Sequence, residues 1–267
     1  MSDVVAVIQM VSGKNVAENL QHAERLISEA AEKNARLVVL PETFACFHAA
    51  KQLELAEELG RGVVQDFLSQ QAKKHGLWLV GGTLPIVSPL PDKVYAASLL
   101  YDDLGQQRAC YNKIHLFDVD VDDAQGSYRE SDTFAPGNDV VVVETPLGRL
   151  GMAVCYDIRF PEFFRKIFEQ QADIISVPAA FTKKTGDAHW LALLRARAIE
   201  NQCYILGANQ GGRHGRRETS GGSVIIDAWG KIKAAADLGE ACVVADYEQS
   251  EIVKIRQAMP VANHRRF

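Results

Sequence analysis

The sequence predicts an α/β protein, a four-layer α-β-β-α sandwich with two pseudo-repeated halves. Short apolar runs alternate with helix-like stretches in both halves of the 267-residue chain. Residues 35–44 recur in pattern as residues 172–181, an offset of 137 residues from Ala35 to Ala172. Residues 98–105 are echoed by residues 223–230, and both segments have the pattern of a strand that runs into a tight turn. Two matches in the same order indicate an internal repeat.

Each half predicts the same series of strand, helix, strand, helix, strand and hairpin. In the first half the elements are strand 4–10, helix 16–34, strand 37–40, helix 62–75, strand 77–81 and a hairpin around Gly105. In the second half they are strand 150–155, helix 161–171, strand 174–177, helix 188–201, strand 203–208 and a hairpin around Gly230. Pro161 suits the first turn of its helix, where a missing N–H is tolerated.

The connections between the strands predict the layers. Helices between short strands place those strands side by side with the helices on one face, and the hairpins extend each sheet with antiparallel strands. Each half then has one bare sheet face, and stacking the two bare faces buries both. We therefore expect a single domain over residues 1–267, in which the segments 88–92 and 121–136 are surface loops rather than domain boundaries.

The composition narrows the class of partner. Apolar residues make up 47% of the chain and charged residues 24%, and the formal net charge is -5 with a pI near 5.8. This charge favours neither a nucleic acid nor an anionic membrane as partner. The first apolar run is only six residues long, and no run approaches the ~18 to 20 apolar residues of a membrane span. We expect a cytoplasmic protein with a small-molecule or protein partner.

The cysteines predict neither disulfides nor a metal site. They are an odd number, widely separated, without a CxxC pair and without histidines at zinc-ligand spacing, namely Cys46, Cys110, Cys155, Cys203 and Cys242. Reduced thiols are expected. Cys155 differs from the others because an apolar strand is expected to end on it and a helix to begin soon after it, which lifts a nucleophile out of a sheet. A buried core thiol is the alternative.

Three further residues have the chemistry of a reactive site. Glu42 follows a strand and Pro41, at the end of a strand where open α/β sheets place ligands. Its repeat partner is Ala179, so the fold does not require a carboxylate there. Lys113 lies among apolar and aromatic neighbours, where the loss of water would strengthen the electrostatic interactions of its charge. Glu130 lies in the polar segment. A solvated side chain is the alternative for each, and for Glu42 an acid at a helix N-terminus is a further alternative.

The three local patterns around Glu42, Lys113 and Cys155, in that order, resemble those of the nitrilase, or carbon-nitrogen hydrolase, superfamily. The matching stretches are residues 40–42, 111–118 and 151–162, and the resemblance extends from Val5 to the C-terminus. It implies the same α-β-β-α sandwich that the repeat predicts, and it implies no metal or organic cofactor.

The resemblance also implies roles for the site residues. Cys155 becomes the nucleophile, Glu42 the general base and acid, Lys113 the electrostatic partner of the oxyanion, and Glu130 a supporting carboxylate. A free thiol has a pKa of ~8.5 and must lose its proton to attack an amide, so an adjacent carboxylate is needed. The backbone N–H of Tyr156 is expected to be a second oxyanion donor.

Within the superfamily, residues 181–190 and 194–200 resemble the Nit subgroup of amidases. This implies hydrolysis of the amide of deaminated glutathione through a Cys155 thioester with release of ammonia, or, as the alternative, ω-amidase activity on 2-oxoglutaramate. The segment 220–223 departs from the pattern of the first branch, which leaves this choice of substrate open. The resemblance further implies a homodimer or a higher homo-oligomer.

Substrate contacts are expected from residues near the nucleophile. They are Tyr156, Arg159, Phe181, Thr182 and Thr185. Arg159 has the geometry to bind a carboxylate in a bidentate manner, and a structural contact with Asp157 is its alternative. Two other functions remain open: a thiol redox protein in which Cys155 forms a sulfenic acid, and a noncatalytic scaffold on the same fold.

Overall fold

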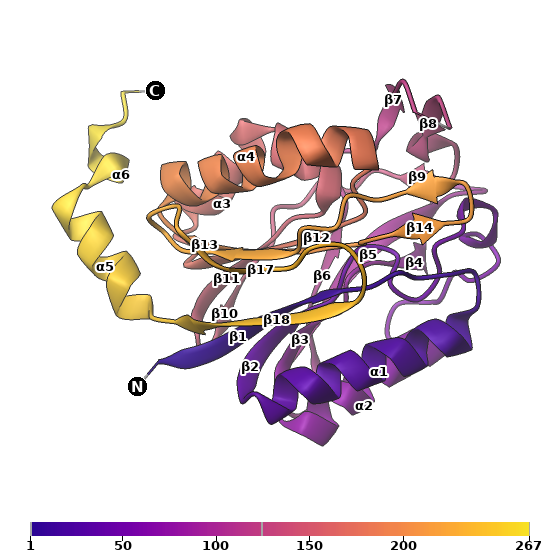
Figure 1. Cartoon of the computed structure of the whole chain (residues 1–267), viewed down its shortest axis with the longest axis horizontal. Coiled ribbons are helices and arrows are strands. Elements are labelled where there is room, and N and C mark those ends of the chain that lie inside the picture. Colours follow the sequence, from indigo (N-terminus) through magenta and orange to yellow (C-terminus); the bar gives the residue numbers. More distant parts are fainter. Residues whose placement is uncertain (1, 124, 267) are drawn as a thin grey trace.

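The computed structural model describes residues 2–123 and 125–266, and in it two sheets lie face to face between two pairs of helices (Figure 1). The larger sheet has the strand order β18-β1-β2-β3-β5-β4, with β6 and β9 also paired to β5. Its strands are β1 (Asp3–Gln9), β2 (Ala35–Val39), β3 (Trp78–Val80), β4 (Leu84–Val87), β5 (Val94–Tyr101), β6 (Gln107–Asn112), β9 (Phe134–Ala135) and β18 (Ala241–Tyr247). Helices α1 (Val16–Glu32) and α2 (Val63–His75) cover its outer face.

The second sheet repeats this plan. Its strand order is β10-β11-β12-β13-β16-β17. The strands are β10 (Val142–Thr145), β11 (Gly148–Met152), β12 (Ile174–Ala179), β13 (Tyr204–Asn209), β16 (Val224–Ile226) and β17 (Ile232–Ala235). Helices α3 (Pro161–Glu169) and α4 (Lys183–Asn201) cover its outer face (Figure 1). Three parallel strands, β11 to β13, correspond to β1 to β3, so the predicted four-layer architecture and its repeat are confirmed.

Strand alternation divides the core into two layers. In β1, Val5 and Val7 join the hydrophobic cluster that includes residues of the second sheet, whereas Ala6 and Ile8 join the cluster beneath α1 and α2. Successive strand residues point to opposite faces, so one strand fills both layers. All four residues are fully buried. This explains why β1 is an almost continuous apolar run.

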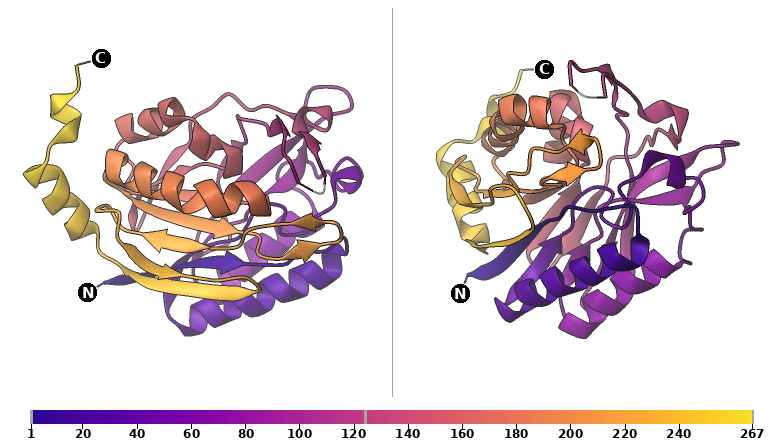
Figure 2. Two further views of the ribbon diagram at one scale, coloured as in Figure 1. Left: turned by 45° about the horizontal axis from the view of Figure 1, so that its top comes forward. Right: turned by 45° about the vertical axis from the view of Figure 1, so that its right-hand side comes forward.

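One strand from the second half of the chain joins the sheet of the first half. β18 comes from the end of the chain yet pairs antiparallel with β1, at the edge of the first sheet. β10 occupies the corresponding edge of the second sheet, antiparallel to β11. After β18 the chain continues into α5 (Gln249–Ala258) and α6 (Val261–His264) at one end of the sandwich (Figures 1 and 2). α5 is docked there through the fully buried Ile252 and through a 3.0 Å hydrogen bond from Arg256 to Asp173.

Several expected element boundaries are corrected. The strand expected over 150–155 ends at Met152, and Cys155 instead begins a 3₁₀-helix, Cys155–Arg159. The helix expected over 188–201 begins at Lys183 because the Thr182 side chain caps it, accepting from the backbone N–H of Thr185. Gly186 lies in the first turn of this helix, and because glycine has a low helix propensity the sequence did not predict that turn.

The segment 121–136 is more structured than a surface loop. It contains β8 (Ser127–Arg129), which pairs with β7 (Asp118–Asp120), then a 3₁₀-helix, Glu130–Asp132, and β9. Phe134 and Ala135 of β9 are buried beside β5. The remaining short elements are a 3₁₀-helix, Ala49–Lys51, and the hairpin of β14 (Arg213–His214) and β15 (Arg217–Glu218).

Candidate active site

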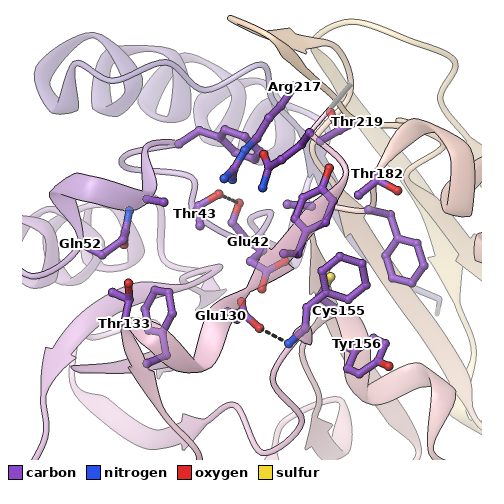
Figure 3. Close-up of a pocket in the computed structure, with 18 of the residues that line it drawn as sticks. Glu42, Thr43, Gln52, Glu130, Thr133, Cys155, Tyr156, Thr182, Arg217 and Thr219 are labelled. Carbon is purple, nitrogen blue, oxygen red and sulfur yellow. Dashed lines mark hydrogen bonds between the residues drawn. The ribbon is translucent and has the colours of Figure 1, made fainter. Parts of the chain in front are cut away.

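A pocket lies where the strands of the two sheets end, and Glu42, Lys113, Glu130 and Cys155 all line it (Figure 3). Glu42 follows β2, Lys113 comes directly after β6, and Cys155 lies three residues beyond β11. Residues from both halves of the repeat therefore meet at one place. The four side chains that were candidates from the sequence therefore lie together in the fold.

Lys113 joins the two carboxylates. Its ammonium nitrogen lies 2.8 Å from Glu42 Oε1 and 2.8 Å from both carboxylate oxygens of Glu130. The Lys113 side chain is 1% exposed. Glu130 also accepts a hydrogen bond of 2.6 Å from the backbone N–H of Phe117. One cation thus holds two carboxylates in a site that excludes most water, which rules out the solvated alternatives for Lys113 and Glu42.

The ionisation of this group follows from burial and charge. Burial lowers the pKa of Lys113, but the charges of Glu130 and Glu42 outweigh it, so the pKa of this lysine is well above its usual value. Burial is also the largest influence on Glu130 and raises the pKa of its carboxyl, a change that Lys113 opposes and Glu42 reinforces. Lys113 is therefore a permanent cation at neutral pH.

Cys155 has a strained backbone and a protonated thiol. Its φ angle is +47°, in the left-handed region that non-glycine residues rarely adopt. Burial raises the pKa of the thiol well above its ordinary value, and the charge of Glu42 and a hydrogen bond to Glu42 raise it further. Lys113 and the backbone N–H of Ala180 act in the opposite direction. The thiol therefore keeps its proton at neutral pH until a base accepts it.

Glu42 is the base that the Cys155 thiol contacts. The backbone of Glu42 is held in place by a residue from the second half of the chain. The side-chain amide of Gln210, which follows β13, donates a 3.0 Å hydrogen bond to the carbonyl of Glu42. The next residue, Thr43, has a φ angle of +54° and donates its N–H to the Thr83 hydroxyl at 2.9 Å. The carboxylate therefore stands on a turn that both halves hold in place.

Asp157 holds the turn at Cys155. One of its carboxylate oxygens accepts hydrogen bonds from the Val154 N–H at 2.8 Å and from the Tyr111 hydroxyl at 2.7 Å. The other oxygen lies 2.7 Å from Nδ1 of His115 and 3.1 Å from the His115 backbone nitrogen. Asp157 is fully buried. Tyr111 and His115 flank Lys113 in the chain, so one carboxylate links the lysine segment to the cysteine turn.

A structural contact between Asp157 and Arg159 was the alternative to substrate binding by Arg159, and the two side chains do not form it. Asp157 is occupied by the partners above, whereas Arg159 Nη2 lies 3.2 Å from His189 Nδ1. The Arg159 guanidinium lies over the Tyr156 and Phe181 rings, at 5.8 and 5.6 Å from their centroids. The alternative of an Asp157–Arg159 pair is therefore wrong. His115 is a structural histidine, because its ring nitrogen and its backbone N–H both contact the buried Asp157.

The expected substrate contacts divide into two groups. Tyr156, Phe181, Thr182 and Thr185 line the pocket, and Arg159 is not among its lining residues. Other residues line the pocket that no sequence pattern pointed to, among them Tyr128, Arg217 and Thr219. Their segments carry no local signal of a site, because only the fold brings β8 and β15 over the pocket.

The described residues contain no group of three or more His, Cys, Asp and Glu side chains that could hold a metal ion. Within the same parts of the chain, every helix is too short or too polar to cross a membrane. The five cysteines are free thiols.

The fold and the buried set of thiol, lysine and carboxylates define the class of carbon-nitrogen hydrolases. The chain belongs to the carbon-nitrogen hydrolase family, whose sequence profile it matches over residues 4–257. It is 46% identical over 266 residues to a deaminated glutathione amidase of Yersinia enterocolitica, covering 98% of this chain and 93% of that protein.

Two solved structures are similar over the whole fold. Saccharomyces cerevisiae Nit3, a member of branch 10 of the nitrilase superfamily, superimposes with a TM-score of 0.90 at 31% identity, over 100% of this chain and 97% of that one. A mutant amidase from Nesterenkonia sp. AN1 has a TM-score of 0.80 at 25% identity, over 98% of this chain and 96% of that one. In that protein the acetamide moiety of fluoroacetamide is covalently added at the active site cysteine.

Proposed function

We propose that this enzyme is an amidase that hydrolyses deaminated glutathione or a similar 2-oxo acid amide. The observation that carries the proposal is the buried thiol of Cys155, which shares a pocket with Glu42 and with the cation Lys113. The Yersinia relative, named a deaminated glutathione amidase, supports the choice of substrate. Activity on 2-oxoglutaramate is the alternative within the same chemistry.

In the first half of the proposed reaction, the Cys155 thiol gives its proton to Glu42 and the sulfur attacks the amide carbonyl. The high pKa of this thiol makes the transfer to a base necessary. Lys113 and the backbone N–H of Tyr156 stabilise the oxyanion of the tetrahedral intermediate. The Tyr156 N–H lies in the first turn of its 3₁₀-helix, where helical N–H groups lack acceptors within the helix.

The intermediate then collapses. Glu42 returns the proton to the departing nitrogen as the carbon–nitrogen bond breaks, which leaves a Cys155 thioester and a free amine. The amide of deaminated glutathione joins the 2-oxo acid to a peptide nitrogen, so the expected release of ammonia is wrong for that substrate, which frees a peptide amine instead. Ammonia is released from a primary amide such as 2-oxoglutaramate. Glu42 next takes a proton from water, the hydroxide attacks the thioester, and the acid departs as the thiol is restored.

Glu130 supports this cycle through Lys113. A lysine paired with Glu42 alone would draw that carboxylate into one fixed ion pair. Both Glu130 oxygens contact the ammonium group, so Lys113 keeps a partner whenever Glu42 carries a proton. Glu130 is accordingly proposed as a positioning residue that does not exchange protons with the substrate.

We further propose a cytoplasmic homodimer in which residues 1–267 form one catalytic domain. The free thiols suit a reducing compartment. Val253 of α5 and Met259, the residue after that helix, are 49% and 42% exposed, and we propose this end of the sandwich as the contact with the second copy. Sedimentation analysis tests the dimer, and fractionation of cells with an antibody to the protein tests its location.

The decisive experiment compares kcat/KM for deaminated glutathione and 2-oxoglutaramate, together with intact-mass detection of an acyl-enzyme in the wild type during turnover and in Glu42→Gln. We expect a thioester on Cys155 with either substrate and a higher kcat/KM for deaminated glutathione. A preference for 2-oxoglutaramate would select the alternative. Inactivity on a broad panel of amides, without any acyl-enzyme, would support the noncatalytic scaffold. Peroxide turnover that depends on Cys155, without amide hydrolysis, would support the redox protein.

A further inference from the structure

The basic side chains that line the pocket differ in their interaction partners. Lys113 is held between Glu42 and Glu130, as described above. Arg129 lies 2.8 Å from Asp120 Oδ1 and also donates to two backbone carbonyls. For Arg217, the interaction seen within the described parts of the chain is with the Tyr128 ring, whose centroid lies 5.7 Å from the guanidinium carbon. No carboxylate of the described residues pairs with it.

The neighbouring carboxylate does not serve as its partner. Glu218, which also lines the pocket, accepts from Nε and Nη2 of Arg213 at 2.9 and 2.5 Å. The Arg213–Glu218 pair closes the β14–β15 hairpin and leaves Arg217 half-buried at the pocket. Figure 3 shows the Arg217 side chain directed into the pocket above the group of Glu42, Glu130 and Cys155.

The segment that carries Arg217 is anchored. The Thr219 hydroxyl accepts from the Gly212 N–H at 3.0 Å and lies 2.9 Å from His214 Nε2. His214 in turn lies 2.7 Å from the Ser12 carbonyl and stacks on Phe47 with ring centroids 3.9 Å apart. Arg217 therefore extends from a fixed hairpin, and its position does not depend on a loose loop.

The charges of the pocket require such a group when the substrate is an anion. Glu42 and Glu130 carry two negative charges against the single positive charge of Lys113, so the reacting end of the pocket is negative while both carboxyls are ionised. A guanidinium that stacks on an aromatic ring keeps its N–H donors free in its plane, and those donors match the two oxygens of a carboxylate.

We propose that Arg217 binds a carboxylate of the amide substrate and thereby selects anionic amides over neutral ones. The inference rests on the proposed amidase function and deepens it. The carboxylate has two possible sources, the 2-oxo acid end of the acyl group or the end of the departing peptide. Tyr128 positions the guanidinium and fixes the plane in which it binds.

The test compares Arg217→Gln with Arg216→Gln, whose residue is exposed and does not line the pocket. The substrates are 2-oxoglutaramate and 4-oxopentanamide, which has the same chain without the carboxylate. If Arg217 binds the acyl carboxylate, we expect Arg217→Gln to lower kcat/KM on 2-oxoglutaramate by about 10- to 100-fold, mostly through KM, because a hydrogen-bonded charge pair is lost. If it binds the peptide carboxylate, the same fall should appear on deaminated glutathione and not on 2-oxoglutaramate. Activity on 4-oxopentanamide should stay within about threefold, because only uniform binding of the carboxylate is removed. Arg216→Gln should change neither.

Two further measurements complete the test. Deaminated glutathione with its terminal carboxylate converted to an amide separates the two sources, since an unchanged Arg217 effect assigns the acyl carboxylate and a lost effect assigns the peptide carboxylate. Calorimetric binding of 2-oxoglutarate to the wild type and to Arg217→Gln examines the anion site without catalysis, so that loss of the proposed amidase function does not obscure it. Equal losses of kcat/KM on 2-oxoglutaramate and 4-oxopentanamide would overturn the inference. So would an Arg217→Gln variant that keeps its kcat/KM on both 2-oxoglutaramate and deaminated glutathione.

Discussion

Lys113 Nζ lies 2.8 Å from Glu42 Oε1, and the two residues are separated by 71 positions in the chain. The contact is almost fully buried, with 1% of the lysine side chain and 6% of the glutamate side chain exposed. Removal of one member of such a pair leaves an uncompensated charge in a region with little water. The site is therefore held together by charge as well as by packing.

Lys113→Met should destabilise the fold by about 3–5 kcal/mol at neutral pH, because Glu42 and Glu130 would face each other without a cation. The loss should shrink as the pH falls, since burial raises the pKa of the Glu130 carboxyl and its protonation removes one of the two facing charges. Urea denaturation at several pH values measures this. Lys74→Met is the matched control, because Lys74 pairs with Glu24 at the surface and is 53% exposed. A stability of Lys113→Met that does not respond to pH would contradict the explanation.

Glu42→Gln should lower the pKa of the Cys155 thiol. Burial is the largest cause of the raised pKa and stays in place, but the charge of Glu42 and its hydrogen bond, which favour the protonated thiol, are lost. The rate of Cys155 alkylation by iodoacetamide, followed by peptide mass spectrometry, should rise at a lower pH in the variant than in the wild type. A midpoint that is unchanged or higher in the variant would show that Glu42 does not control this thiol.

Cys155→Ser should lower kcat/KM for amides by on the order of 10⁴-fold or more and remove the acyl-enzyme mass, because the residue is the proposed nucleophile. Cys110→Ser provides the comparison, since Cys110 is only partly buried and does not line the pocket. It should retain close to full activity. Amide hydrolysis that survives in Cys155→Ser would assign the nucleophile elsewhere.

Asp157→Asn should reduce both stability and kcat. An amide has one accepting oxygen in place of two, so at least one of the bonds from Val154, Tyr111 and His115 is lost, at about 1–3 kcal/mol for a buried group left unsatisfied. Tyr111→Phe removes a single hydroxyl and should cost less in the same urea titration.

The role of Asp157 is one of position, so kinetics separate it from simple loss of stability. We expect kcat to fall in Asp157→Asn with little change of KM, because the turn at Cys155 moves while the rest of the pocket is kept. Normal kcat in folded Asp157→Asn protein would limit Asp157 to stability.

The first half of the fold follows closely from local sequence. Apolar runs bounded by polar residues predict β1 to β3, and the repeat between residues 35–44 and 172–181 predicts that two such sheets stack. The edge strand β18 was not expected, because nothing in the sequence of residues 241–247 says which sheet they join. The pairing of β18 with β1 depends on the path of the chain in the folded protein and not on the local sequence of either strand.

The sequence by itself determined the types of residue at the site and the elements that carry them. Glu42 follows the expected strand 37–40, and Cys155 follows the strand expected over 150–155, although that strand ends earlier, at Met152. Local backbone preferences suffice to place strands before these two residues. Only the tertiary structure decided their partners: Lys113 between two carboxylates, Glu42 held by Gln210 from 168 residues away, and Arg217 over the pocket. Periodicity and turn residues act over a few positions, whereas these contacts arise from the packing of two sheets whose residues lie far apart in the chain.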